Sequence, residues 1–549
     1  MKGWNSFLRF VALNLALPTF ALLATGAAWA QPQAISSAAR FGPSEEQIAF
    51  TAQAQGLMAT DTPTSEQTAP KKQAPEGQTG QAADPITSEQ SAPDKAAADK
   101  SAPEKVISPQ EAKDLFRSVD ELMKFASDDT GLPIKHEVKR KLASREEVQS
   151  YLEKGMKDDK DAKRLERSSE VLKKFGLLPR DFQLGPFLVS MLKEQVAGYY
   201  DPKKKTVNIL NWIDPEQQKP VLAHELTHAL QDQSFGMEKW MKEAETEGDK
   251  KNDPTPADID NDEESSAREA VVEGQAMVVM LDYTLAPTGK TLVDMPQIGE
   301  AMKQGMLDGP DSPTFSKAPI FLKEELTFPY RFGMDFTLAL EKAGGKKLGF
   351  EGAFNDPPTT TRQIMEPETY IGHEVIKPLK RIDFKKDFDK YDTFDIGAIG
   401  EFDVDVLVEQ YAGREEAQAM YPAWRGGYYF AGRAKGGSSG TTKSGALSVV
   451  YASRWATEQK AAEFAGDYAK SLANRYQEHA AVGDDGKVME DAPPAGAWKT
   501  LRGKHAWMTE EGTVVIEVRG DEVLVCESLD DGTVRMVEGD FFGPGAEKK

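Results

Sequence analysis

Cysteine is almost absent from this chain, which limits both its cross-links and its chemistry. Cys526 is the single cysteine among 549 residues, so no disulfide can form within the chain. Its neighbours in VLVCES are mostly apolar, which predicts a side chain packed in a strand rather than a nucleophile. Histidine is scarce as well, with six residues in all, so a histidine pair at a meaningful spacing is informative.

Positive charge is in deficit. The chain has 67 lysines and arginines against 89 aspartates and glutamates, and its formal net charge is -22. Nucleic-acid phosphates and anionic lipid headgroups both attract basic surfaces, so this balance argues against either of them as a partner. We therefore expect no nucleic-acid partner and no adhesion to an anionic membrane.

A long hydrophobic run occurs at the N-terminus. Lys2 and Arg9 precede the uncharged run VALNLALPTFALLATGAAWA, which ends in a small-x-small pattern. This arrangement predicts a signal peptide over 1–30, cleaved after Ala30, with an uncleaved membrane anchor as the alternative. No cysteine lies near the cleavage site, which argues against a lipoprotein. The short charged start is typical of bacteria, so we expect a periplasmic or secreted protein with no membrane span after cleavage.

Large apolar side chains are also rare over residues 31–107, which are rich in Ala, Pro, Ser, Thr and Gln. Such a composition cannot bury enough apolar surface to offset chain entropy, so we expect a disordered tether. Order is expected to begin near Ser108, where Ser-Pro precedes apolar residues at helical intervals, namely Leu115, Val119, Leu122 and Phe125.

The remaining chain is predicted to form two domains of α+β class. Residues 108–390 are mainly helical, with a hairpin predicted where VAGYYDPKKKTVNILNW turns at Asp-Pro. An acidic surface insertion is expected there over 241–265. Residues 395–549 predict a small α+β domain with strands at GGYYFAG, ALSVVYAS, TVVIEVRG and DEVLVCES. The last two strands are expected to form a hairpin around Gly520-Asp521, and ATEQKAAEFAGDYAKSLANRY predicts a helix.

The stretch KPVLAHELTHALQDQSF carries His224, Glu225 and His228 in the pattern H-E-x-x-H. A spacing of i and i+4 puts both imidazoles on one helical face, where they can bind one zinc ion. Glu225 lies about 100° further around the helix axis, close to such an ion without binding it. The alternative is an ordinary helix with two histidines on its surface. The apolar side that anchors the helix consists of Leu222, Leu226, Ala229 and Leu230.

Zinc needs a third protein ligand and an open position for water. No other histidine follows His228 in the form H-x-x-G-x-x-H, which excludes the metzincin arrangement. The helical segment SAREAVVEGQAMVVM offers two carboxylates instead, Glu269 and Glu273, one turn apart on the same face. Both are flanked by apolar residues, where a lone buried carboxylate is costly without a partner.

These motifs resemble the gluzincins, a group of zinc metallopeptidases. HELTHALQD looks like the active-site helix of thermolysin-like peptidases, and VEGQA is similar to the third-ligand segment of aminopeptidase N-like enzymes. The resemblance implies a zincin-like peptidase domain in which His224, His228 and Glu273 bind one zinc ion. It also implies that Glu225 is the general base. The chain between the two motifs is longer than is usual in gluzincins, because the acidic insertion lies between them.

The second motif can be matched in another way. If REAVVE is aligned with the third-ligand segment of thermolysin itself, Glu269 becomes the ligand and Glu273 orients a histidine. The order of AGYYDP, HELTHALQDQ, VVEGQA and PPTTTRQIMEPETY also resembles a set of poorly characterised exported bacterial H-E-x-x-H proteins.

The resemblance implies an exported zinc peptidase that acts on a peptide or protein substrate. The alternative is a catalytically silent zinc-binding protein, or an envelope or partner-binding protein, on a peptidase scaffold. Gluzincins often use a Tyr or His to stabilise the oxyanion, and the candidates here are Tyr330, Tyr283 and His373.

A second possible metal motif is DIDNDEES, whose alternating acids could bind calcium. Glu263 stands where an EF-hand loop needs glycine, so a solvated acidic loop is expected instead.

Overall fold

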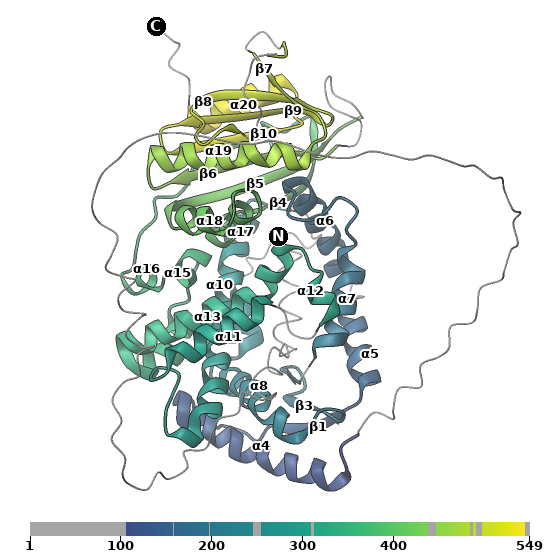
Figure 1. Cartoon of the computed structure of the whole chain (residues 1–549), viewed down its shortest axis with the longest axis vertical. Helices are drawn as coiled ribbons and strands as arrows, with labels where there is room; N and C mark the ends of the chain where they lie inside the picture. Colours follow the sequence, from purple (N-terminus) through teal and green to yellow (C-terminus); the bar gives the residue numbers. More distant parts are fainter. Residues whose placement is uncertain are drawn as a thin grey trace, which may run out of the picture. The chain divides into compact units, whose positions relative to one another are not determined.

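The computed structural model describes residues 106–156, 159–196, 198–244, 254–308, 312–436, 446–483, 487–489 and 497–543 (Figure 1). The predicted signal peptide and nearly all of the predicted tether lie outside these residues. Within them the chain combines helices with two sheets, which confirms the α+β class. Among these same residues, no helix is both long and apolar enough to cross a membrane.

The first helix of the described chain, α4 (Pro109–Thr130), begins where the sequence predicts it. The hydroxyl of Ser108 accepts a hydrogen bond from the backbone N–H of Glu111 at 3.2 Å. The Glu111 carboxylate accepts one in return from the backbone N–H of Ser108 at 2.6 Å, which completes a capping box. The buried face of α4 packs against α8 (Pro215–Phe235).

Two helices of 28 residues, α10 (Asp258–Leu285) and α13 (Ile320–Lys347), pack against each other. Near its end α13 is interrupted at Gly344 and Gly345, and a π-helical segment, η2 (Leu348–Gly352), follows. In the described part of the chain before residue 390, the other helices are α5 (Arg145–Met156), α6 (Asp159–Phe175), α7 (Leu184–Gln195), α9 (Met237–Glu243), η1 (Ala286–Thr288), α11 (Pro296–Asp308), α12 (Pro313–Ser316), α14 (Ala353–Asn355), α15 (Thr361–Met365) and α16 (Pro367–Ile371).

A three-stranded sheet with the strand order β1-β3-β2 packs against α8. The predicted hairpin is confirmed as β2 (Tyr199–Asp201) and β3 (Thr206–Leu210), which pair antiparallel. The sequence did not predict β1 (Lys139–Ala143), which pairs parallel with β3. Its sequence KRKLA lacks the β-branched residues of a buried strand. Its lysines and arginine are instead typical of an edge strand.

The second sheet has seven strands in the order β4-β5-β6-β10-β9-β8-β7, all paired antiparallel. Its strands are β4 (Tyr391–Ala398), β5 (Trp424–Ala434), β6 (Ser448–Trp455), β7 (His479–Val482), β8 (Gly503–Thr509), β9 (Gly512–Arg519) and β10 (Glu522–Glu527). The accompanying helices are α17 (Glu401–Ala412), α18 (Arg414–Met420), η3 (Tyr421–Ala423), α19 (Glu458–Arg475) and α20 (Asp531–Phe542).

The four predicted strands of this region correspond to β5, β6, β9 and β10, and the predicted helix corresponds to α19, which lies along the sheet (Figure 1). The predicted hairpin is confirmed, because Arg519 of β9 pairs with Glu522 of β10. Cys526 is buried in β10, as expected for a packed strand residue. The sequence missed β4, β7 and β8, whose segments mix polar and apolar residues without a strong β-rich run.

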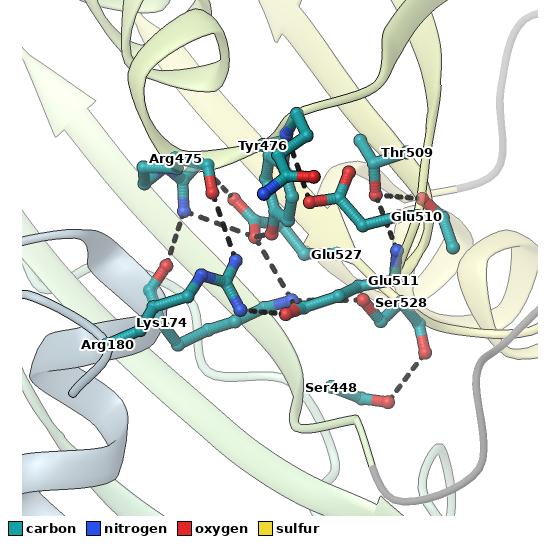
Figure 2. A network of polar contacts seen from close by, with 12 residues as sticks. Lys174, Arg180, Ser448, Arg475, Tyr476, Thr509, Glu510, Glu511, Glu527 and Ser528 are labelled. Atoms are coloured by element: carbon teal, nitrogen blue, oxygen red, sulfur yellow. Dashed lines mark hydrogen bonds and ion pairs between the residues drawn. The ribbon is translucent and has the colours of Figure 1, made fainter. Parts of the chain in front are cut away.

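A buried ionic network joins α6 to the seven-stranded sheet (Figure 2). Glu527 of β10 is fully buried and accepts hydrogen bonds from Arg475 and from the Tyr476 hydroxyl, both at 2.6 Å. Lys174 of α6 lies 3.6 Å from the same carboxylate and donates to Glu511 at 2.8 Å. Burial alone would raise the pKa of Glu527, but Arg475 and Lys174 outweigh it and lower this pKa to about 2.

The expectation of a solvated acidic loop is wrong for residues 258–265, which form the first turns of α10. Asp262 and Glu263 are buried there because partners distant in sequence meet them. The backbone N–H of Thr361 donates to Glu263 at 3.0 Å, and that of Ala398 donates to Asp262 at 3.2 Å. Burial raises the pKa of Asp262 to about 6 and that of Glu263 to about 8.

Candidate metal centre

The H-E-x-x-H motif lies in α8, and the middle of this helix is buried on every side. The side chain of Asp214 accepts a hydrogen bond from the N–H of Glu216 at 3.0 Å and so starts the helix at Pro215. Pro220 therefore lies inside the helix. The predicted anchoring residues of α8 are all buried, as expected.

The second motif lies in α10, at the point where this helix crosses α13. A Cβ atom added to Gly274 would lie 2.0 Å from the carbonyl carbon of Gly333, and one added to Gly333 would lie 2.0 Å from the carbonyl oxygen of Ala270. Only glycine permits so close a crossing. The crossing brings Tyr330 of α13 within electrostatic reach of Glu273 of α10.

The structure brings His224, His228 and Glu273 together. The two Nε2 atoms are 3.0 Å apart, and the Glu273 Oε2 atom lies 3.2 Å from that of His224 and 3.5 Å from that of His228. The imidazole rings are perpendicular, with an interplanar angle of 90°. Among the residues that the structure describes, these three form the one group of His, Cys, Asp or Glu side chains that could bind a metal ion together. Their ligand atoms all lie within 4.8 Å of one another.

The charges of this group suit a cation. Burial alone would raise the pKa of Glu273, but His228 and His224 outweigh it and hold this pKa below its usual range. Burial would lower the pKa of His228, but Glu273 outweighs it and raises that pKa to about 9. The carboxylate thus faces positive charge, and a divalent cation would supply that charge with both imidazoles neutral. Two imidazole nitrogens and one carboxylate oxygen are a known zinc donor set, so these residues fit zinc.

Glu225 lies beside the group without belonging to it. Its Oε2 atom accepts a hydrogen bond of 2.7 Å from the backbone N–H of Tyr200 in β2. Gly198, just before this strand, is close enough that an added Cβ would lie 3.9 Å from the Glu225 side chain. Burial raises the pKa of Glu225, although His224 opposes the shift. The sequence did not predict the contact with Tyr200, which depends on how the hairpin packs on α8.

The three oxyanion candidates lie in different surroundings. Tyr330 is buried with its ring centroid 6.3 Å from that of His224. Its pKa is raised by burial and by the carboxylates of Glu273 and Glu269, which keeps the hydroxyl protonated. Tyr283 instead packs its ring against Phe125, with centroids 5.3 Å apart. His373 is exposed in the turn that follows α16.

Glu269 is buried one turn before Glu273, but it does not belong to the group that His224, His228 and Glu273 form. Sequence reasoning also missed Gln231, whose Oε1 atom lies 2.9 Å from the Nδ1 atom of His228. The available signal was its position three residues after His228, because residues at this spacing meet on a helix.

Comparison of this chain with protein-family models, with curated proteins and with solved structures gives no significant match. The gluzincin resemblance therefore remains a prediction that depends on the two short motifs.

Proposed function

We propose that this protein is an exported zinc-dependent peptidase that hydrolyses peptide bonds in a peptide or protein substrate. The observation that carries the proposal is the convergence of His224, His228 and Glu273, with Glu225 buried beside them. A zinc site with two histidines, one glutamate and an adjacent carboxylate that is not a ligand has the groups that hydrolysis of an amide requires.

Each side chain then has a distinct task. Zinc, when bound, supplies a water of lowered pKa and polarises the scissile carbonyl. Glu225 accepts the proton of the attacking water and returns it to the leaving amine. Because Tyr200 holds the Oε2 atom of Glu225, the Oε1 atom is the one that takes the proton. Burial raises the pKa of this carboxylate, which is the direction that suits a group that must hold a proton between two steps.

Two further features support a peptide substrate. β2 is an edge strand of the small sheet, and an extended peptide can add to such an edge through backbone hydrogen bonds. Tyr330 carries a protonated hydroxyl near the carboxylates of the site, where it can donate a hydrogen bond to the developing oxyanion.

The alternative is a zinc-binding protein without catalysis, which serves the envelope or a partner. The observation that favours it is burial, because His224, Glu225, His228 and Glu273 are each at most 1% exposed. The ring of Tyr151 in α5 also stacks on Tyr199 of β2, with centroids 4.7 Å apart.

Metal analysis together with peptide hydrolysis separates the two functions. We expect the full chain to contain about one zinc ion and to cleave members of a peptide library. A chelator should abolish this cleavage. Glu225→Gln should retain the zinc and lose activity by about 10²-fold or more, because the substitution removes the general base and leaves the three metal ligands in place.

Glu216→Gln is the matched control, since Glu216 lies exposed on the same helix. It should leave both zinc and activity unchanged. Stoichiometric zinc with no turnover of any peptide would favour the silent protein, and absence of zinc binding would refute both functions.

A further inference from the structure

The imidazole of His228 is hydrogen-bonded to one buried glutamine, Gln231, and a second buried glutamine, Gln275, is hydrogen-bonded to the first. We infer that Gln231 and Gln275 are positioning residues that determine which nitrogen of His228 faces the metal, an inference that rests on the proposed function. Gln231 belongs to α8 and Gln275 to α10, and neither side chain has any exposed surface.

Backbone carbonyl oxygens determine the direction of these hydrogen bonds, because they can only accept. The Nε2 atom of Gln231 lies 3.0 Å from the carbonyl oxygen of Val272, which can only accept. The amide group must therefore face Val272 with its nitrogen, and its Oε1 atom must face His228. Since this oxygen can only accept, the Nδ1 atom of His228, 2.9 Å away, must carry the proton.

Gln275 is oriented by the same logic. Its Nε2 atom donates to the carbonyl oxygen of Gly349 at 2.8 Å, which turns its Oε1 atom toward Gln231. The second proton of the Gln231 amide is donated to this oxygen at 3.0 Å. Three of these hydrogen bonds therefore run in one direction, from His228 through both amides to Gly349 of the π-helical segment η2. The fourth branches from Gln231 to the backbone of α10.

The consequence is a fixed tautomer. With its proton on Nδ1, a neutral His228 presents the lone pair of Nε2, and this atom is the one that faces His224 and Glu273. The chain thus orients the ring and leaves Nε2 as the atom that can bind an ion, as the hydrogen-bond partners of metal-binding histidines do. His224 differs, because its Nδ1 atom has no hydrogen-bond partner among the described residues.

Zinc affinity of the full chain, measured by competition with a chelator, tests this inference. Gln231→Leu should weaken zinc binding about 10- to 100-fold, the usual effect of removing such a partner. Gln275→Leu should also weaken zinc binding, but by less, because it removes the hydrogen bond between Gln231 and Gln275, which does not touch His228 itself.

The matched control is Gln218→Leu. Gln218 is another buried glutamine of α8, and its amide bonds to the backbone of Leu210 and Ile213 instead of to a histidine. This variant should lose stability and keep the zinc affinity of the wild type. Unchanged zinc affinity in a folded Gln231→Leu, or an equal loss in Gln218→Leu, would overturn the inference.

A second measurement needs no variant. Nitrogen NMR of the zinc-loaded wild type should show His228 with a proton on Nδ1 and zinc on Nε2, whereas zinc on Nδ1 would overturn the inference. A wild type that binds zinc but fails these tests contradicts the positioning role alone. A wild type that binds no zinc contradicts the proposed function, and the positioning role with it.

Discussion

Gly274 and Gly333 meet where α10 crosses α13, and their backbones are so close that neither position has room for a Cβ atom. We predict that Gly274→Ala lowers the free energy of unfolding by about 1–3 kcal/mol or more, because the clash is with backbone that has no alternative rotamer. Chemical denaturation measures the change. Gly305→Ala is the matched control, since Gly305 lies in helix α11 with open space around it. That variant should stabilise the protein by about 0.5–1 kcal/mol. Equal stability of Gly274→Ala and the wild type would show that the crossing is looser than described.

The choice between the two carboxylates of α10 is the next prediction. Glu273 lies within 3.5 Å of both imidazoles, so Glu273→Ala should abolish stoichiometric zinc binding. Glu269→Ala should retain the zinc, because Glu269 is not part of the ligand group. Metal analysis of both variants beside the wild type gives the answer. Loss of zinc from the Glu269 variant alone would reverse the assignment.

The ionic network around Glu527 predicts a loss of stability in acid. Its folded pKa of about 2 lies below the ordinary value of 4.5. The stability that Glu527 contributes is therefore fully present above about pH 4.5, and it is lost as the pH falls towards 2. Glu527→Gln should cost about 3–5 kcal/mol at pH 7, because Arg475 then stays buried without its carboxylate partner, while Lys174 keeps Glu511.

Urea denaturation at several pH values tests this. The curves of the wild type and of Glu527→Gln should converge as the pH falls from 4.5 towards 2. Glu458→Gln, at an exposed position of α19, should follow the wild type throughout. A constant difference between Glu527→Gln and the wild type at every pH would contradict the assignment.

Local geometry made part of the site predictable. The spacing of His224 and His228 on one face follows from helix periodicity. The assignment of Glu273 as the third ligand depended on the resemblance of VEGQA, which contains Gly274, to a known ligand segment. The structure gives that glycine a physical role, because it is the residue at which α10 meets α13.

Other features depend on partners distant in sequence. The acidic residues at the start of α10 are solvated or buried according to whether Thr361 and Ala398 reach them, which no local pattern records. β1 is a strand because it pairs with β3, which follows it by more than sixty residues, and its own composition does not favour a strand. The glutamines behind His228 likewise become informative only when α8 and α10 are placed together.

The backbone N–H of Tyr200 has a use beyond the contact with Glu225 described above. This hydrogen bond ends on a buried carboxylate rather than on a neighbouring strand, so it breaks when the hairpin separates from α8. Amide hydrogen exchange at this one position therefore reports how often the interior of the site meets solvent. An exchange rate faster than turnover would identify opening of the hairpin as a step that substrate entry can use, and a slower rate would assign entry to another side of the site.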